Sequence, residues 1–312
     1  MKKTIALVLA LVLAVAVFAG CAAKTAASSA AATTAAAAAT TTAAATTTTA
    51  AATTTAAATT AAATTASTAA EATDGSLKAI KDKGQFILGL DDSFPPYGYS
   101  ENGEIKGFDI DLAKEVCKRL GVELKCQPIN WDTKVAELNN GNIDCIWNGF
   151  TITDEMKKQV LFTEPYVENK QIIVVGADSD IKTKADLAGK TVGVQNGSSA
   201  NNAIDAEADV KKTFAELVQI DDNVSALMEL KNGTVDAVVL DQAVGMKYVN
   251  SEPDTYKVLE DNFGGEQYGI GFRLTDVSLM QAVQSTLNDM RKDGTFANIV
   301  AKWPDVTGAI VD

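Results

Sequence analysis

Short apolar runs alternate with amphipathic stretches over most of the chain after residue 73. Residues 86–90 form an apolar run with the length of a buried strand. Residues 107–120 place apolar side chains at helical spacing, and Gly121 follows where a helix commonly ends. Residues 123–127 predict the next strand. Repeated strand–helix–strand units favour a mainly parallel sheet flanked by helices, so the expected fold class is α/β.

A similar unit begins again near residue 186. A strand is expected at 191–195, followed by a glycine turn and a helix from about Ser198. Segments 137–144 and 229–236 share a Glu-Leu pair, an Asn-Gly turn and a final Asp. This similarity favours two α/β lobes of one general design, with common turn chemistry as the alternative interpretation.

Two β-rich stretches, 171–176 and 267–273, bracket the second unit and would carry the chain out of one lobe and back. A helical stretch at 278–303 would then return to the first lobe. We therefore expect one lobe to contain residues 74–172 and 268–312, and the other to contain residues 173–267. Two crossings form a hinge, and the cleft beside a hinge is a favoured place for a small ligand.

The first 73 residues have a different character. Lys2 and Lys3 precede an apolar run at 5–19 and then Gly20, which predicts a secretory signal peptide over 1–20. The run is short for a membrane span, although an uncleaved anchor helix is the alternative. After Cys21, the chain to residue 73 is almost entirely Ala and Thr. It has no apolar face to bury, so it predicts a flexible tether over 21–73, with a sparsely helical stalk as the alternative.

Composition excludes several classes of function. The net charge of −13 argues against nucleic acid and anionic membrane surfaces as partners, since both attract basic proteins. The absence of histidine removes Ser-His-Asp and Cys-His catalysis and the usual zinc sites. Cys117, Cys126 and Cys145 lack the close spacing of a metal site. One disulfide with a leftover thiol and three free thiols both remain open, and no cofactor or metal is expected.

Gly-Phe-Asp-Ile-Asp-Leu-Ala at 107–113 resembles the signature of the family-3 extracellular solute-binding proteins. Further similar segments follow in the same order at 140–144, 148–153, 162–166, 193–199 and 240–242. The resemblance extends over residues 76–303. It implies a monomeric two-lobed clamshell of the type II periplasmic-binding-protein fold, with two hinge strands. Such a protein captures a small polar ligand, here an amino acid, for the permease of an ABC importer.

Residues 17–21 are similar to a bacterial lipobox, with Phe18 where leucine is usual. This implies a lipid on Cys21 and an extracytoplasmic protein held at the bacterial cell membrane by that anchor alone.

The resemblance also implies which residues bind the ligand. Phe94 would place an aromatic face over it, and Trp131 and Trp147 would add walls. In the motif that begins at Asn148, Gly149 and Thr151 would offer a carbonyl and a hydroxyl to the amino-acid head group.

On the second lobe, Ser198 and Ser199 open a helix whose free N–H groups would accept a carboxylate, with a plain helix cap as the alternative. Asp241 follows an apolar strand and matches the aspartate that holds the ligand ammonium.

One residue departs from the family pattern. Met156 stands where an arginine usually clamps the α-carboxylate with two hydrogen bonds, and methionine cannot donate. Three readings remain open: the carboxylate rests on the Ser198–Ser199 helix start alone, the ligand has no α-carboxylate, or Lys157 stands in. Arg119, Arg273 and Arg291 have no obvious route to the cleft.

Other functions compete with amino-acid binding. A cyclohexadienyl-dehydratase-like enzyme would use a cleft acid such as Asp91 or Asp241, but no catalytic pair is evident. A sensor input module predicts a transmembrane helix and an output domain after the lobes, which this sequence does not contain. A binding protein for an amine that is not an amino acid is the remaining alternative, and Asp91 beside Asp92 weakly favours cationic ligands.

Overall fold

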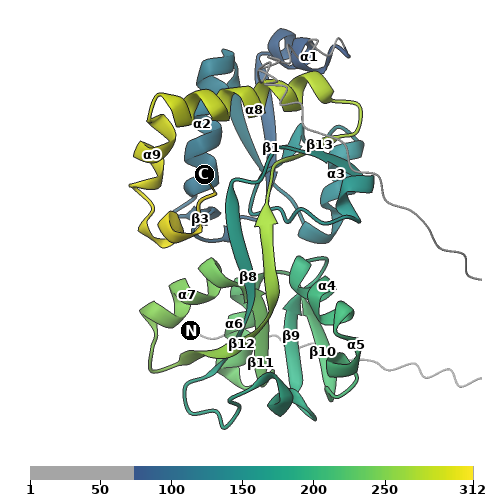
Figure 1. The fold of residues 1–312 in the computed structure, drawn as a ribbon, viewed down its shortest axis with the longest axis vertical. Helices are drawn as coiled ribbons and strands as arrows, with labels where there is room; N and C mark the ends of the chain where they lie inside the picture. Colours follow the sequence, from purple (N-terminus) through teal and green to yellow (C-terminus); the bar gives the residue numbers. More distant parts are fainter. Residues whose placement is uncertain (1–73, 312) are drawn as a thin grey trace, which may run out of the picture. The chain divides into compact units, whose positions relative to one another are not determined.

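The computed structural model describes residues 74–311, which contain two five-stranded sheets, a small three-stranded sheet and the helices that cover them (Figure 1). The predicted signal peptide (1–20), Cys21 and the tether (21–73) lie outside the described residues. None of the described helices is long and apolar enough to cross a membrane.

The first sheet has the strand order β5-β1-β6-β13-β7. Its strands are β1 (Gln85–Leu90), β5 (Glu123–Pro128), β6 (Cys145–Ile146), β7 (Val160–Phe162) and β13 (Gly271–Arg273). β1 pairs in parallel with β5 and β6, whereas β13 is antiparallel to β6 and β7. A late segment of the chain therefore completes a sheet that an early segment begins. The small sheet contains β2 (Ser93–Phe94), β3 (Gly98–Glu101) and β4 (Glu104–Lys106).

Helices from both ends of the described chain pack on this first lobe (Figure 1). They are α1 (Ser76–Lys83), α2 (Phe108–Leu120), α3 (Lys134–Asn139), α8 (Val277–Lys292) and α9 (Thr295–Val300), with short 3₁₀ turns η1 (Trp131–Thr133), η2 (Met156–Lys158) and η4 (Pro304–Ala309). The predicted helix at 107–120 is confirmed and ends at Gly121, with φ 76°. The helical stretch expected at 278–303 is two helices, because Gly294 adopts φ 80° between them.

The second sheet has the order β10-β9-β11-β8-β12. Its strands are β8 (Val167–Gly176), β9 (Thr191–Gln195), β10 (Glu216–Ile220), β11 (Ala237–Asp241) and β12 (Tyr256–Tyr268). β9, β10 and β11 are parallel, while β8 and β12 are antiparallel to their neighbours. Around them lie η3 (Lys184–Leu187), α4 (Ser199–Ala206), α5 (Ala208–Lys211), α6 (Asn223–Asn232) and α7 (Gln242–Ser251).

The long strands β8 and β12 link the second sheet to the first lobe (Figure 1). Tyr268, the last residue of β12, bridges Thr151 of the first lobe, and Val167, the first of β8, bridges Ile310. The lobe boundaries expected at 172/173 and 267/268 fall within β8 and near the end of β12. They stay a prediction.

Cys117, Cys126 and Cys145 are free thiols. Of the two states left open by the sequence, the structure has the one without a disulfide. Burial raises the pKa of the Cys117 thiol to about 12, so this thiol is a weak nucleophile.

Candidate functional site

A cavity of about 30 Å³ lies where the two lobes face each other. The first lobe contributes Phe94, Trp131, Lys134, Gly149, Thr151 and Met156 to its lining. The second contributes Gln195, Ser198, Ser199 and Asp241. This volume holds about one water molecule. A larger ligand therefore requires the lobes or the lining side chains to move apart.

Asp241 is the acidic residue of this lining. It is the last residue of β11 and only 4% exposed. Its Oδ1 accepts hydrogen bonds from Asn169 Nδ2 at 2.7 Å, from Gln171 Nε2 at 2.9 Å and from the hydroxyl of Tyr268. Burial and the nearby Glu266 raise the pKa of Asp241 to about 7. A carboxylate held in this way gains strongly from an incoming cation.

Glu266 is a second carboxylate at the same place, and the sequence analysis did not identify it. Its Oε1 accepts from Asn169 Nδ2 and Gln171 Nε2, both at 2.8 Å. It also accepts from Thr151 Oγ1 at 2.9 Å and Ser199 Oγ at 3.1 Å. Asp241 and Glu266 thus share two amide donors. This pair of acids would favour an ammonium or guanidinium group between them.

The sequence contains one weak signal for the residues around Asp241 that the sequence analysis did not identify. Glu266 and Tyr268 are two apart on β12, so they lie on the same side of the strand and both reach the Asp241 cluster. Asn169 and Gln171 show the same spacing on β8. The strand period predicts that each pair shares a face, but which face meets the cleft depends on how the lobes pack.

The wall formed by Phe94 depends on a glycine. Gly149 has φ 59°, and a Cβ there would lie 2.5 Å from the Phe94 ring. Its N–H donates to Asp109 Oδ2 at 3.0 Å, and the Tyr166 hydroxyl donates to Asp109 Oδ1 at 2.8 Å. Burial raises the pKa of Asp109 to about 7. The structure therefore uses a buried acid to orient the backbone beside the cavity.

The second lobe presents the start of a helix. Ser198 is the N-cap of α4 and accepts from Asn201 N at 3.2 Å, while its hydroxyl donates to Gln195 O at 2.7 Å. Ser199 Oγ lies 3.1 Å from Thr151 Oγ1 of the first lobe. The helix therefore points its positive end into the cavity.

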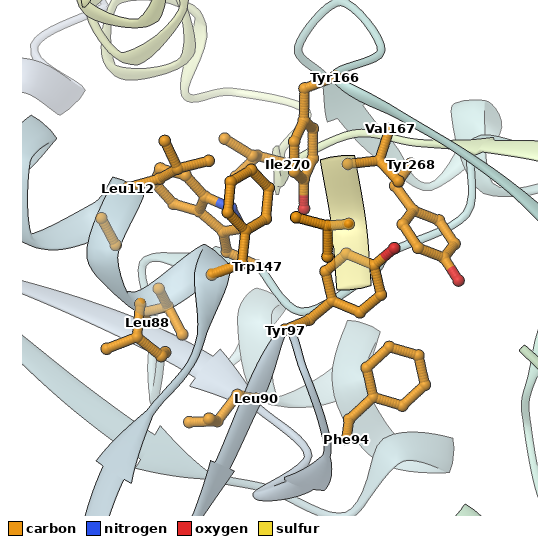
Figure 2. Packing of buried hydrophobic residues seen from close by; sticks show 14 of the residues in the cluster. Leu88, Leu90, Phe94, Tyr97, Leu112, Trp147, Tyr166, Val167, Tyr268 and Ile270 are labelled. Carbon is orange, nitrogen blue, oxygen red and sulfur yellow. The ribbon is translucent and has the colours of Figure 1, made fainter. Parts of the chain in front are cut away.

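Three predicted ligand residues lie outside the lining. Trp147 is fully buried in the hydrophobic cluster shown in Figure 2, together with Leu88 and Tyr166. Asn148 accepts from Asp91 N at 3.1 Å, and so supports the loop after β1. Asp91 accepts from Gln195 Nε2 at 2.7 Å and joins the two lobes. The remaining predicted residues on both lobes come together at the cavity.

Met156 lies in the lining and packs against the hydrophobic cluster that contains Trp131 and Phe150. Lys157 is exposed, with 57% of its side chain accessible, and pairs with Asp154 at 3.2 Å. It lines a separate hollow of about 1010 Å³. The arginine-like role considered for Lys157 therefore has no support from its position.

The arginines are engaged elsewhere. Arg119 pairs with Glu115 and Asp293 at 2.8 Å. Arg273 donates to Leu138 O and Ile143 O, and Arg291 donates to Val311 O. Among residues 74–311, Lys134 is the one cationic side chain in the cavity lining.

Contacts across the cavity hold the lobes together. Asn196 Nδ2 donates to Asp132 Oδ2 at 3.2 Å, and Lys134 Nζ donates to Gly197 O at 2.8 Å. A Cβ on Gly197 would lie 2.7 Å from Asp132 Cα. The two lobes therefore touch closely beside the cavity.

A two-lobed α/β protein with a polar cavity at its lobe interface has the form of a solute-binding protein, and the sequence model of bacterial extracellular solute-binding proteins, family 3, matches residues 86–306. The chain belongs to this family. The L-cystine-binding protein TcyJ of Escherichia coli K12 is 31% identical over 241 residues, which cover 76% of this chain and 89% of that one.

Solved structures agree with the fold. A substrate-binding protein of an ABC uptake transporter from Streptococcus pneumoniae, with bound histidine, superposes with a TM-score of 0.71 at 34% identity, covering 74% of this chain and 96% of that one. An ancestral arginine-binding protein bound to arginine gives a TM-score of 0.66 at 42% identity, with coverage of 70% and 98%. The two-lobed fold and the family predicted from sequence are confirmed.

These relatives are binding proteins. Within residues 74–311 no group of three or more Cys, Asp or Glu side chains is arranged to hold a metal ion.

Proposed function

We propose that this chain captures an amino acid between its lobes and delivers it to the permease of an ABC importer. The observation that carries this proposal is Asp241, a buried carboxylate at the end of β11 that lines the cavity and faces Glu266. A ligand ammonium placed there replaces water with charge-assisted hydrogen bonds. The relatives bind cystine, histidine or arginine, and each of these ligands carries such an ammonium.

The rest of the cavity suits an amino acid. Phe94 offers an aromatic face, and the α4 start offers N–H groups to an anion. The ligand would sit with its ammonium near Asp241 and its carboxylate towards the helix start. The acid pair favours a second cationic group on the ligand side chain.

The membrane arrangement is part of the same proposal. Removal of a signal peptide over 1–20 would expose Cys21 to acylation, and residues 22–73 would separate the anchor from the lobes. The protein would then act as a monomer outside the cytoplasm. Cys21→Ser should release the protein into the medium, while Cys117→Ser should leave it on the membrane fraction.

The test of ligand binding is thermal stabilisation of the purified full-length protein after co-purified ligand has been removed by unfolding and refolding. A ligand at a hundredfold excess over its Kd stabilises by about 2.7 kcal/mol through mass action. We expect L-arginine, L-histidine, L-glutamine or L-cystine to raise the melting temperature. Stabilisation by amines alone would support the amine-binding alternative. Turnover of prephenate or arogenate would support the enzyme alternative.

A further inference from the structure

We infer that Lys134 anchors the carboxylate of the ligand, in place of the arginine that the family resemblance implies at position 156. This inference rests on the proposed function, since it concerns the same cavity. Lys134 would then determine specificity for ligands with a carboxylate. The ligand would keep its carboxylate although Met156 cannot donate a hydrogen bond to it.

Lys134 is placed in the cavity by two elements. Residue 134 begins α3 directly after η1, which contains Trp131. Lys134 is only 7% exposed and belongs to the lining. Its ammonium lies 5.0 Å from the centroid of the Trp131 ring and 6.0 Å from that of Phe150. These two rings hold the long side chain inward by packing and by cation–π attraction.

Its hydrogen bonds leave capacity for a ligand. Nζ donates to Trp131 O at 2.9 Å and to Gly197 O at 2.8 Å. An ammonium has three N–H groups, so the described acceptors use two of them. Gly197 immediately precedes the Ser198 cap of α4. The ammonium therefore lies beside the start of α4.

No carboxylate of residues 74–311 forms an ion pair with Lys134 Nζ, and the charge of Asp132 offsets its burial only in part. Burial lowers the pKa of Lys134 to about 8. Keeping a buried ammonium without an ion-pair partner is costly. A ligand carboxylate would supply that partner.

Met156 and Lys134 occupy the same part of the cavity. Met156 packs against the cluster that contains Trp131 and Phe150, and the Lys134 ammonium lies over the same two rings. A cation that enters from residue 134 therefore reaches the region that a cation from residue 156 would reach. Asp241 lines the same cavity from the second lobe, and Glu266 shares its two amide donors. The lining therefore offers one ammonium and one carboxylate, the two charges that a zwitterion needs.

The test compares ligands that differ only in their carboxylate. The probes are L-arginine with agmatine, L-histidine with histamine, L-glutamine with 4-aminobutanamide, and L-cystine with cystamine. Calorimetry on the full-length wild type first identifies the amino acid that binds, and its affinity is measured against that of the decarboxylated partner. Lys134→Met keeps most of the side-chain length and removes the charge. It should weaken binding of the amino acid by about ten- to a hundredfold and leave binding of the amine within about threefold.

Two further variants separate a carboxylate anchor from a structural role. Lys157→Met, the matched loss of a neighbouring exposed lysine, should leave both affinities unchanged. The double variant Lys134→Met with Met156→Arg should regain most of the preference for the amino acid, because it restores a cation to the same region. Circular dichroism and the melting temperature establish that each variant is folded.

Each outcome decides between the two proposals. If the wild type binds no amino acid, the proposed function fails and the inference fails with it. If it binds one but Lys134→Met lowers the affinities for amino acid and amine equally, the inference alone is overturned. Should Lys134→Met not fold, a crystal structure of the wild type with the amino acid decides: the inference requires a carboxylate oxygen within hydrogen-bond distance of Lys134 Nζ.

Discussion

Single residues in the cavity carry charges that are costly to bury and that do not pair with one another. No ion pair joins Lys134 to Asp241 or Glu266 in the described part of the chain. Each acid instead accepts from neutral amides and hydroxyls. Such a cavity is destabilising when Asp241 ionises and becomes favourable when a ligand supplies the missing partner. Removing one of these charges should therefore weaken ligand binding and stabilise the ligand-free protein.

The variant Asp241→Asn tests this expectation through the pH dependence of its stability. The pKa of Asp241 is raised from its ordinary 3.8 to about 7 in the folded protein. Between these values the folded state keeps a proton that the unfolded state has released, so the stability contribution falls as pH rises through this window. At pH 8 the ligand-free variant should be more stable than the wild type by on the order of 4 kcal/mol, and the gain should shrink towards pH 4. Urea denaturation across this range measures it.

The same variant should bind the ligand on the order of a hundredfold more weakly, since it removes the charge that faces the ammonium. Asp236→Asn, which removes an exposed acid just before β11, is the control for net charge and should bind normally. Equal effects of the two variants would contradict a direct role for Asp241.

Gly149→Ala is expected to destabilise the first lobe. The new Cβ would lie 2.5 Å from the Phe94 ring, at a residue with φ 59°. Strain and the clash together should cost about 2–4 kcal/mol. Gly141→Ala has φ 77° with open space around it, so it should cost only about 1 kcal/mol. Urea midpoints of the two variants measure the difference, and similar values would show that Phe94 moves aside without cost.

At the scale of elements, residues that line the cavity lie where strands end and helices begin. Asp241 is the last residue of β11, and Ser198 caps α4 after β9. Parallel strands direct these ends to one edge of the sheet. The periodicity of the sequence located both elements closely: β9 is the predicted 191–195, and α4 begins one residue after Ser198. Elements with a clear apolar period and a cap can be predicted because both signals are local.

Two neighbouring serines at the start of α4 are expected to affect protein stability and ligand binding differently. Ser198→Ala removes the cap that accepts from Asn201 N, and should cost about 1 kcal/mol of stability. Ser199 is not the cap, but its hydroxyl lies at the cavity beside Thr151 and Glu266. Ser199→Ala should therefore change stability less and ligand affinity more. Urea denaturation and calorimetry on both variants check this, and the reverse order would contradict the assignment of the two serines.

The whole molecule has its lobes in contact around a cavity that holds about one water molecule. Hydrogen bonds from Lys134, Asn196 and Gln195 cross between the lobes. β8 and β12 are the two strands that join the lobes, so motion about them is the simplest way to open the cavity.

Small-angle X-ray scattering should therefore report a larger radius of gyration for the ligand-free protein than for the ligand-bound one. Residues 1–73 add to the signal, so the comparison uses the same full-length protein with and without ligand. An unchanged radius of gyration with saturating ligand would mean that side-chain movement alone admits the ligand.

The sequence by itself determined several of the elements, the two-lobed fold and most residues that the cavity brings together. Helical and strand periods depend on nearby residues, and the family motifs carry Phe94, Thr151, Ser199 and Asp241 in a recognisable order. These features can be predicted because each depends on a short stretch of chain.

Only the tertiary structure decided which buried charges meet. Trp147 directly follows β6 and Lys134 begins α3. Trp147 enters the core, and Lys134 enters the cavity. Glu266 reaches Asp241 because β12 and β11 both flank β8. Such contacts join residues far apart in the chain, and their geometry depends on the packing of two lobes, which no local pattern encodes.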